Sequence, residues 1–257
     1  MSPSQSQSSG KLYVVGIGPG SPQHLTLRAV EVLEGAHVII GNGTYLDQIE
    51  HLITDQQVIR SGMGKEVDRA RKAIELARDR RVAMVSGGDS NVYGMAGLML
   101  EVAQHTDLDV EIEIVPGVTA LSAVASLLGA PVVSDFAIIS LSDLLTPWDV
   151  IEKRLEAATT SDMVIGIYNP KSRQRNTNFS RAVDIIRRNR ADTVPVGIVK
   201  NALRPKGETV IVTTLGKVLD HDEEVDMSTT VIVGNSESRI WDSKIITPRG
   251  YHKKYEY

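Results

Sequence analysis

The chain has 257 residues and a mass of 28.0 kDa, which suits one large α/β domain or two smaller ones. Hydrophobic residues make up 42% of it and charged residues 23%, as in ordinary globular proteins and unlike disordered, collagen-like or coiled-coil chains. The formal net charge of −4 argues against a general nucleic-acid binder, whose affinity depends on neutralising phosphates. We therefore expect no nucleic-acid partner.

The chain contains no cysteine, which excludes disulfides, thiolate zinc sites, cysteine-held iron–sulfur clusters and cysteine nucleophiles. No apolar run approaches the roughly 18 residues needed to span a bilayer. Residues 1–10 are rich in Ser and Gln and lack the apolar core of a secretion signal. We expect residues 1–10 to form a disordered tail, and the protein to be cytoplasmic with no membrane partner.

In the first half of the chain, short apolar runs alternate with segments of helical periodicity. Strands are predicted over residues 11–15, 36–40, 82–85 and 110–115. Helices are predicted over residues 26–35, 66–80, 92–104 and 119–128. In the second of these helices Val67, Ala70, Ile74 and Ala77 share the face expected to be buried. Such alternation predicts parallel βαβ crossovers in an N-terminal α/β domain over residues 11–128.

The pattern is interrupted at Leu128-Gly129-Ala130-Pro131, so a linker is expected over residues 129–136 and a second α/β domain over residues 137–250, followed by a tail over residues 251–257. Strands are predicted over residues 136–141, 163–168, 195–200, 208–215 and 229–234. The last two leave no room for a long helix between them, which predicts a mixed sheet.

Two helices are predicted in this second half. Thr146 is expected to cap the first and Pro147 to occupy its first helical position. In the second, Phe179, Ala182, Val183 and Ile186 share a face.

Three glycine-containing loops follow predicted strands. Residues 16–21 (GIGPGS) fail as a dinucleotide fingerprint, because Ser21 stands at the third glycine position, Pro19 lacks an N–H, and the second strand does not end in a ribose-binding acid. Residues 86–91 (SGGDSN) lie where open α/β sheets bind ligands; there Asp89 either binds a ribose hydroxyl or helps to cap the next helix. Residues 115–120 (VPGVTA) follow the next strand, so the three loops are expected to line one crevice.

Basic residues gather between Lys171 and Lys206, where ten of them stand against only two acids. Arg187, Arg188 and Arg190 are interpreted as a solvated helix face. Lys171, Arg173 and Arg175 follow Tyr168-Asn169-Pro170, and they are candidates for clamping a carboxylate-rich or phosphorylated small molecule. No two of the six histidines have metal-binding helical spacing, so no protein-bound metal is expected.

The segments GIGPGS with Leu25-Thr26, SGGDSNVYG, VPGVTA with LLGAP after it, and IYNP together resemble the tetrapyrrole methylase family of two-domain enzymes. The resemblance covers nearly all of residues 11–250. Further segments (SLSDLLTPW, YNPKSR, GIVKNA, TTVIVGNS and ITPRGY) resemble the members that methylate C-17 of precorrin-3B or cobalt-precorrin-3 and promote ring contraction in cobalamin biosynthesis.

The resemblance implies a two-lobed fold with a mostly parallel N-terminal sheet, a mixed C-terminal sheet and an active site in the cleft between the lobes. It also implies a homodimer, an anionic tetrapyrrole substrate with or without cobalt, and S-adenosylmethionine as the methyl donor, released as S-adenosylhomocysteine. Such a methyl transfer needs alignment and a dry cleft more than a protein nucleophile.

The resemblance also assigns roles to individual residues. Those implied in cofactor binding are Pro19, Gly87, Gly88, Asp89, Asn91, Val92, Thr119, Ala120, Asn169, Ala202 and Thr230. The three implied in catalysis are Ser21, Lys65 and Glu66, with helix capping as the competing role of Glu66. Lys171, Arg173 and Arg175 are implied in substrate binding. The chain departs from the family at Ser90, where proline is usual, and at Ser21, where several relatives carry an acid.

Three alternatives stay open. The same chemistry at another macrocycle position differs only in pocket shape. A noncatalytic nucleotide- or anion-binding α/β module would bind the methyl donor poorly and transfer no methyl group. An NAD-dependent oxidoreductase is disfavoured by the failed fingerprint. The sequence does not distinguish a cobalt-containing from a metal-free substrate, because cobalt would travel inside the macrocycle and need no protein ligand.

Overall fold

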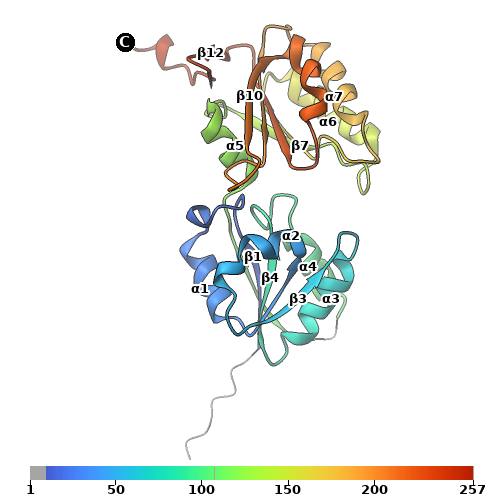
Figure 1. Cartoon of the computed structure of the whole chain (residues 1–257). Coiled ribbons are helices and arrows are strands. Elements are labelled where there is room, and N and C mark those ends of the chain that lie inside the picture. Colours follow the sequence, from blue (N-terminus) through green and yellow to red (C-terminus); the bar gives the residue numbers. More distant parts are fainter. Residues whose placement is uncertain (1–9, 107, 257) are drawn as a thin grey trace, which may run out of the picture. The chain divides into compact units, whose positions relative to one another are not determined.

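A computed structural model of the protein describes residues 10–106 and 108–256, and the chain divides into two compact units (Figure 1). The first unit ends at Ala120 and the second begins at Leu121. This division lies earlier than the boundary expected after Leu128. The reason is that helix α5 (Ala120–Leu128) packs its apolar residues, Leu121 and Leu128 among them, against Ile232 in the core of the second unit. None of the described helices is long and apolar enough to cross a membrane.

The first unit is built on a parallel sheet in the order β3-β2-β4-β1-β5. Its five strands are β1 (Lys11–Gly16), β2 (Val38–Asn42), β3 (Gln57–Ser61), β4 (Arg81–Ser86) and β5 (Glu111–Val115). Its helices are α1 (Leu27–Gly35), α2 (Gly43–Gln48), α3 (Glu66–Leu76) and α4 (Ala96–Gln104), with the short 3-10 helices η1 (Pro22–His24) and η2 (Glu50–Leu52). The predicted parallel βαβ architecture of this half is confirmed, whereas α2 and β3 were not predicted.

Successive β1 side chains point to opposite faces of the sheet, as in any strand. Leu12 and Val14 lie in one apolar cluster with residues of α3 and α4, and Val15 and Ile17 lie in another with residues of α1. Figure 1 shows α1 on one side of this sheet and α3 and α4 on the other. Both faces of the sheet are therefore covered, which explains why its strands read as continuous apolar runs.

Helix α3 differs in detail from its prediction, since it ends at Leu76 and leaves Val67 45% exposed. Arg69 occupies the buried side instead, because its Nη1 donates to Ser61 Oγ at 2.6 Å and to the Gly62 carbonyl at 3.1 Å. A buried guanidinium is tolerated where such acceptors are built into the neighbouring strand end. The hydrophobic pattern alone does not reveal them.

Helix α4 begins at Ala96, four residues after the predicted start. Tyr93 has a positive φ of 53°, which a right-handed helix cannot contain. The N–H of Ala96 donates to the Ser90 carbonyl at 2.9 Å, and the Met95 N–H donates to Ser86 Oγ at 3.3 Å. Residues 87–95 therefore form a longer loop than expected at the end of β4.

The second unit contains a mixed sheet, as the sequence predicted, and its strand order is β10-β9-β11-β8-β7. Its strands are β7 (Phe136–Ser140), β8 (Val164–Tyr168), β9 (Pro195–Lys200), β10 (Thr209–Thr214) and β11 (Thr229–Val233). Strand β11 is antiparallel to both β8 and β9, and β7 is parallel to β8. It follows that β7, β8 and β9 all end at the same edge, where β11 begins.

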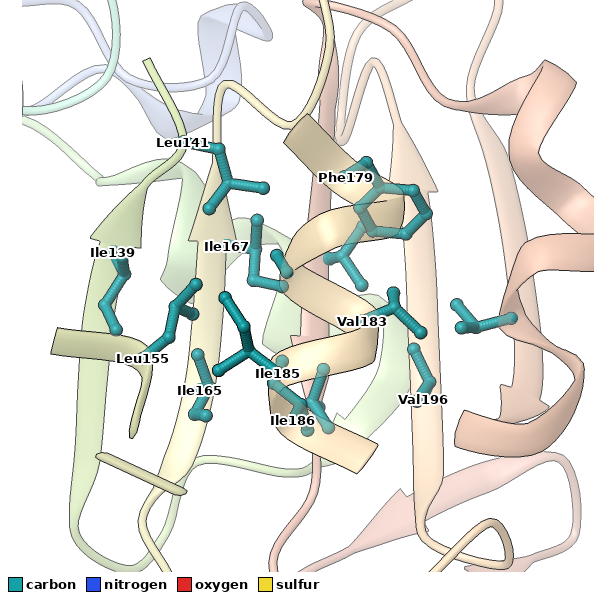
Figure 2. Packing of buried hydrophobic residues seen from close by; sticks show 14 of the residues in the cluster. Ile139, Leu141, Leu155, Ile165, Ile167, Phe179, Val183, Ile185, Ile186 and Val196 are labelled. Atoms are coloured by element: carbon teal, nitrogen blue, oxygen red, sulfur yellow. The ribbon is translucent and has the colours of Figure 1, made fainter. Parts of the chain in front are cut away.

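Helices α6 (Trp148–Thr160) and α7 (Asn178–Arg187) cover one face of this sheet, and α5 covers the other. Figure 2 shows Phe179 and Val183 of α7 among the side chains of Ile167 in β8 and Val196 in β9. The predicted apolar face of α7 is confirmed, since all four of its residues are buried. The 3-10 helix η3 (Leu215–Glu224) joins β10 to the segment before β11.

The predicted cap of α6 is wrong by one residue. Pro147, with φ −55° and ψ 146°, occupies the capping position in place of Thr146. The Pro147 carbonyl accepts the N–H groups of Val150 at 3.1 Å and Ile151 at 3.3 Å, so the first helical bonds start from Pro147.

The remaining strands are short. Strands β12 (Arg239–Trp241) and β13 (Lys244–Ile246) pair in antiparallel fashion, and β13 also pairs with β6 (Gly129–Ala130). The expected linker over residues 129–136 thus contains a strand. The 3-10 helix η4 (Tyr251–Lys253) lies near the end of the chain, where a tail was expected.

Candidate functional site

The loops after β1 and β4 flank the point where the chain changes direction in the first sheet. From β1 the chain crosses past β4 to β2, whereas from β4 it crosses past β1 to β5. In open α/β sheets, ligands bind outside the carboxyl ends of the strands at such a switch point. Topology therefore selects residues 17–26 and 87–95 as candidates for ligand contact.

These two loops are hydrogen-bonded to each other through their glycines. The Gly18 N–H donates to the Gly88 carbonyl at 3.0 Å, and the Gly88 N–H donates to the Gly18 carbonyl at 2.8 Å. Both glycines have positive φ, 73° and 65°, a conformation that other L-residues rarely adopt. Pro19, a candidate cofactor contact, follows directly on this bridge.

The loop after β5 joins the same group. A Cβ atom added at Gly16 would lie 2.7 Å from Gly117 N and 2.8 Å from the Gly88 oxygen. A Cβ added at Gly117 would lie 2.3 Å from that oxygen. The three loops thus meet at the carboxyl edge of β1, β4 and β5. That they line one crevice stays a prediction.

Asp89 links two of these loops. Its Oδ2 accepts the Gly117 N–H at 2.9 Å and its Oδ1 accepts the Asn91 N–H at 2.8 Å. Neither Asp89 oxygen therefore caps α4, whose first N–H bonds instead to the Ser90 carbonyl. Ser90 itself is buried, and its Oγ donates to the Val115 carbonyl at 3.3 Å, a bond that proline could not form.

The remaining cofactor candidates of the first unit lie around the same loops. Val92 donates its N–H to the Asp89 carbonyl at 3.3 Å. A Cβ at Gly88 would have Ala120 N at 3.8 Å and Thr119 Cα at 4.0 Å as its nearest neighbours. The missing Gly88 side chain thus leaves space in front of the backbone at Thr119 and Ala120.

Tyr45 is a residue of this site that the sequence reasoning missed. A Cβ at Gly87 would lie 2.4 Å from Tyr45 Cε1, so the phenol ring packs directly on the Gly87 backbone. Tyr45 belongs to α2, which was not predicted. A signal was present in Asn42, whose Oδ1 accepts the Thr44 N–H at 2.9 Å and so caps this short helix.

Within the described residues, no side-chain hydrogen bond or ion pair joins the three candidate catalytic residues to one another. Ser21 caps the 3-10 helix η1 through its carbonyl, which accepts the His24 N–H at 3.0 Å, and its side chain makes no capping bond. Lys65 precedes α3 and lies 3.6 Å from Asp68 as an exposed ion pair. Glu66 accepts the N–H of Gly64, a residue before α3, at 3.1 Å, so neither its capping role nor its catalytic role is decided by this bond.

In the second unit, Asn169, Ala202 and Thr230 lie at one edge of the mixed sheet. Asn169 follows the end of β8, Ala202 follows the end of β9 closely, and Thr230 lies at the start of β11 between them. Asn169 has a positive φ of 50°, and its Nδ2 donates to Ser140 Oγ at 2.9 Å, which ties the ends of β8 and β7 together. Asparagine tolerates this left-handed conformation better than most residues.

The basic loop after β8 is largely committed to internal contacts. Lys171 Nζ donates to the Asp222 carbonyl at 2.7 Å and forms an ion pair with the Asp222 carboxylate. Arg175 Nη1 donates to the Leu141 carbonyl at 3.0 Å, and its Nε lies 3.7 Å from Asp143 Oδ1. Arg173, by contrast, is exposed and forms no ion pair or hydrogen bond with any residue that the structure describes.

A hollow of about 430 Å³ opens beside this loop. It is lined by Lys171, Ser172, Arg173, Val225, Asp226, Met227 and Ser228. Burial raises the pKa of Asp226, but hydrogen bonds from Lys200 and Ser228 outweigh it and hold that pKa below its ordinary value. The Asp226 carboxylate is thus a neutralised part of the wall.

No three His, Asp or Glu side chains in the described part of the chain gather closely enough to hold a metal ion.

The interpretation of Arg190 as part of a solvated helix face is wrong, because this residue is only 8% exposed. Its guanidinium donates to the carbonyl oxygens of Gly234 and Met163, and burial lowers its pKa.

Comparison with known proteins gives a consistent result. A family model described as Tetrapyrrole (Corrin/Porphyrin) Methylases matches residues 11–219. A probable cobalt-factor III C(17)-methyltransferase from Salmonella typhimurium is 50% identical over 242 residues, which are 93% of this chain and 99% of that protein. The cobalamin biosynthesis protein CbiHC from Archaeoglobus fulgidus is 51% identical over 248 residues, 96% of this chain. The chain spans about half (54%) of the length of that relative.

A more distant relative, a precorrin-3B C(17)-methyltransferase from Sinorhizobium sp., is 39% identical over 251 residues, covering 94% of this chain and 97% of that protein. Among solved structures, the methyltransferase CobJ matches with a TM-score of 0.86 at 33% identity, covering 93% of this chain and all of that one. A uroporphyrin-III C-methyltransferase from Thermus thermophilus, complexed with S-adenosylhomocysteine, matches with a TM-score of 0.68 at 26% identity. The match covers 88% of this chain and 92% of that one.

Proposed function

Because the chain belongs to the tetrapyrrole (corrin/porphyrin) methylase family, we propose that it methylates C-17 of precorrin-3B or of its cobalt-containing counterpart, with contraction of the ring. The observation that carries this proposal is the 50% identity to the Salmonella C(17)-methyltransferase over almost the full length of both chains. The meeting of the glycine loops at the switch point of the first sheet, where open α/β sheets bind ligands, supports it.

S-adenosylmethionine supplies an electrophilic methyl group on a sulfonium, and the macrocycle carbon supplies the electron pair. The chain's part in such a displacement is to bind, align and exclude water. In the first unit, Gly87, Gly88, Thr119 and Ala120 present backbone groups at the switch point, and the absence of a Gly88 side chain leaves room there. These are the groups that would hold the nucleoside part of the cofactor.

The remaining candidates have supporting roles in this proposal. Asp89 keeps the loops after β4 and β5 in place, with Asn91 and Val92 completing its turn. In the second unit, Asn169, Ala202 and Thr230 share one sheet edge and would contribute further cofactor contacts. Ser21 offers a hydroxyl at the end of the first glycine loop, where it could donate a hydrogen bond during ring contraction.

Relatedness favours the cobalt-containing substrate. The chain is 50% identical to a relative named for cobalt-factor III and 39% identical to one named for precorrin-3B. The test is incubation with cobalt-factor III and with metal-free precorrin-3B, each with methyl-labelled S-adenosylmethionine. We expect one methyl group at C-17 by mass spectrometry and NMR, with the cobalt form turned over faster.

Failure with both substrates rejects the assignment. A labelled methyl at another carbon supports the same chemistry at a different position, and S-adenosylmethionine binding without transfer supports a noncatalytic module. The homodimer implied by the resemblance also belongs to this proposal, and sedimentation velocity of the purified chain would measure it.

A further inference from the structure

The hollow beside the basic loop lies at the edge of the mixed sheet that carries Asn169 and Thr230. Lys171, Ser172 and Arg173 follow the end of β8, and residues 225–228 lead directly into β11, its neighbour in the sheet. Its volume of about 430 Å³ lies within the range of small-ligand pockets, roughly 300–1,000 Å³. The hollow is thus large enough for a substrate's charged arms.

The charges of its walls are not equivalent. The Lys171 side chain is 12% exposed, and its ammonium is bound by Asp222. Asp226 is paired with Lys200 Nζ at 2.6 Å and also accepts N–H and O–H from Ser228. With these two pairs neutralised, the guanidinium of Arg173 remains as the uncompensated charge among the lining residues.

We propose that Arg173 binds a peripheral carboxylate of the tetrapyrrole substrate in this hollow, while Lys171 and Arg175 only hold the loop in shape. The proposal rests on the proposed function and divides a loop of three cations into one binding residue and two positioning residues. Arg175 qualifies as positioning because its Nη1 bonds to the carbonyls of Leu141 at 3.0 Å and Asn169 at 3.4 Å.

The chemistry of the hollow suits a carboxylate on an apolar frame. A guanidinium presents a planar pair of donors that matches the two oxygens of a carboxylate. Ser172 and Ser228 line the same space, and Val225 and Met227 add apolar surface beside them. An acetate or propionate arm carried on a pyrrole ring has this combination of groups, and the methionine carboxylate of the cofactor is the other possible source.

The test compares the full-length chain with Arg173→Gln and Arg173→Lys, using cobalt-factor III and S-adenosylmethionine in steady-state methyl transfer. We expect Arg173→Gln to raise the KM for the tetrapyrrole about tenfold, as for the loss of a charge-assisted hydrogen bond, with kcat within twofold. The KM of Arg173→Lys should lie between those of the wild type and Arg173→Gln, because lysine keeps the charge but lacks the planar pair of donors. Added salt should raise the wild-type KM more steeply than that of Arg173→Gln.

Arg154→Gln is the matched control, since Arg154 is an exposed arginine of α6 in the same unit and does not line the hollow. Its KM should equal that of the wild type. Lys171→Gln should lower the thermal midpoint, whereas Arg173→Gln should leave it unchanged. An unchanged tetrapyrrole KM in Arg173→Gln overturns the proposal. So does weaker calorimetric binding of S-adenosylmethionine in that variant, because the bound carboxylate is then the cofactor's.

Failure of the proposed function would be recognised separately, as absence of methyl transfer by the wild type. In that case fluorescence quenching with uroporphyrin III, which carries eight carboxylates, measures the site directly. About tenfold weaker binding to Arg173→Gln than to wild type then supports the inference. Equal binding by the two proteins, or none by the wild type, overturns it.

Discussion

The carboxylate of Asp89 accepts the backbone N–H of Gly117 at 2.9 Å, which fixes the loop after β4 against the loop after β5. Its second oxygen accepts the Asn91 N–H, so one side chain sets both the shape of its own loop and the spacing to the next. Bonds to an ionised acceptor are stronger than bonds between neutral groups. Asp89 therefore serves the site by organising its backbone.

Asp89→Ala should weaken the binding of S-adenosylmethionine by about tenfold or more, because two N–H groups lose a charged acceptor at about 1.5–3 kcal/mol each. The affinity of Asp89→Asn should lie between those of the wild type and Asp89→Ala, since an amide has only one oxygen that can accept a hydrogen bond. Isothermal calorimetry measures the effect. Asp55→Asn, at an exposed position outside these loops, is the control and should bind as the wild type does. Wild-type affinity in Asp89→Ala would show that the loops keep their places without this carboxylate.

Gly117→Ala tests the close approach of the loops. The new Cβ would lie 2.3 Å from the Gly88 oxygen and 2.7 Å from Gly16 C, and both are backbone atoms that cannot rotate away. We expect a loss of 1–3 kcal/mol in the free energy of unfolding, as for overpacking, together with weaker cofactor binding.

Gly97→Ala is the matched control for that substitution. Gly97 lies in α4, and no atom is found within 4 Å of an added Cβ. Alanine is the better helix former by about 1 kcal/mol, so this variant should be equally or more stable. Equal stability of the two variants would mean that the loops separate easily, contrary to the packing described.

The glycine loops could be predicted from sequence because two local signals coincide there. An apolar run marks each strand, and the glycines after Val15 and Val85 mark where that strand stops. A parallel sheet then brings all carboxyl ends to one edge without further information. The sequence could not show which loop atoms bond to each other, because the contact between Asp89 and Gly117 spans 28 residues and depends on the strand order.

The hydrophobic pattern of the sequence failed mainly at two arginines that are buried in the structure. Arg69 and Arg190 stand in charged surroundings, and periodicity assigns such residues to solvent. Both are buried, and a backbone carbonyl accepts an N–H group of each: Gly62 for Arg69 and Gly234 for Arg190. A side chain whose partners lie 44 residues away, as Gly234 does from Arg190, leaves no local signal. For the same reason the sequence could not show that Lys171 and Arg175 bond to other segments of the chain, and it gave both of them the same role as Arg173.

Arg190→Met should destabilise the second unit by about 2–4 kcal/mol, because it leaves the carbonyls of Gly234 and Met163 without donors in a buried place. Arg188→Met is the control two residues earlier. The Arg188 side chain is 56% exposed and paired with Glu152 and Glu156, and exposed pairs contribute about 0–1 kcal/mol. Urea unfolding followed by tryptophan fluorescence reports on this unit, because both Trp148 and Trp241 lie in it. Equal midpoints in the two variants would contradict the assignment.

The ionised Glu113 carboxylate should contribute to the stability of the first unit, and this contribution should be lost in acid. It bonds to Lys11 Nζ at 3.0 Å and to the Arg28 guanidinium at 2.8 Å, and so joins β5 to β1 and α1. Burial raises the pKa of Glu113, but these two cations outweigh it and hold the pKa below its ordinary value of about 4.3. A lowered pKa in the folded state adds stability above pH 4.3 and loses it as the pH falls further.

Glu113→Gln should therefore unfold about 1 kcal/mol more easily at pH 7, where the wild-type carboxylate is ionised. The difference from wild type should shrink between about pH 4.5 and pH 3, because protonation removes the same charge from the wild-type protein. Urea midpoints at pH 7, 5, 4 and 3, followed by circular dichroism, measure it. Glu34→Gln is the control, since Glu34 is exposed on α1 and has no ion pair within the part of the chain that the structure describes. A difference that stays constant over this range would show that the two cations do not stabilise the ionised carboxylate.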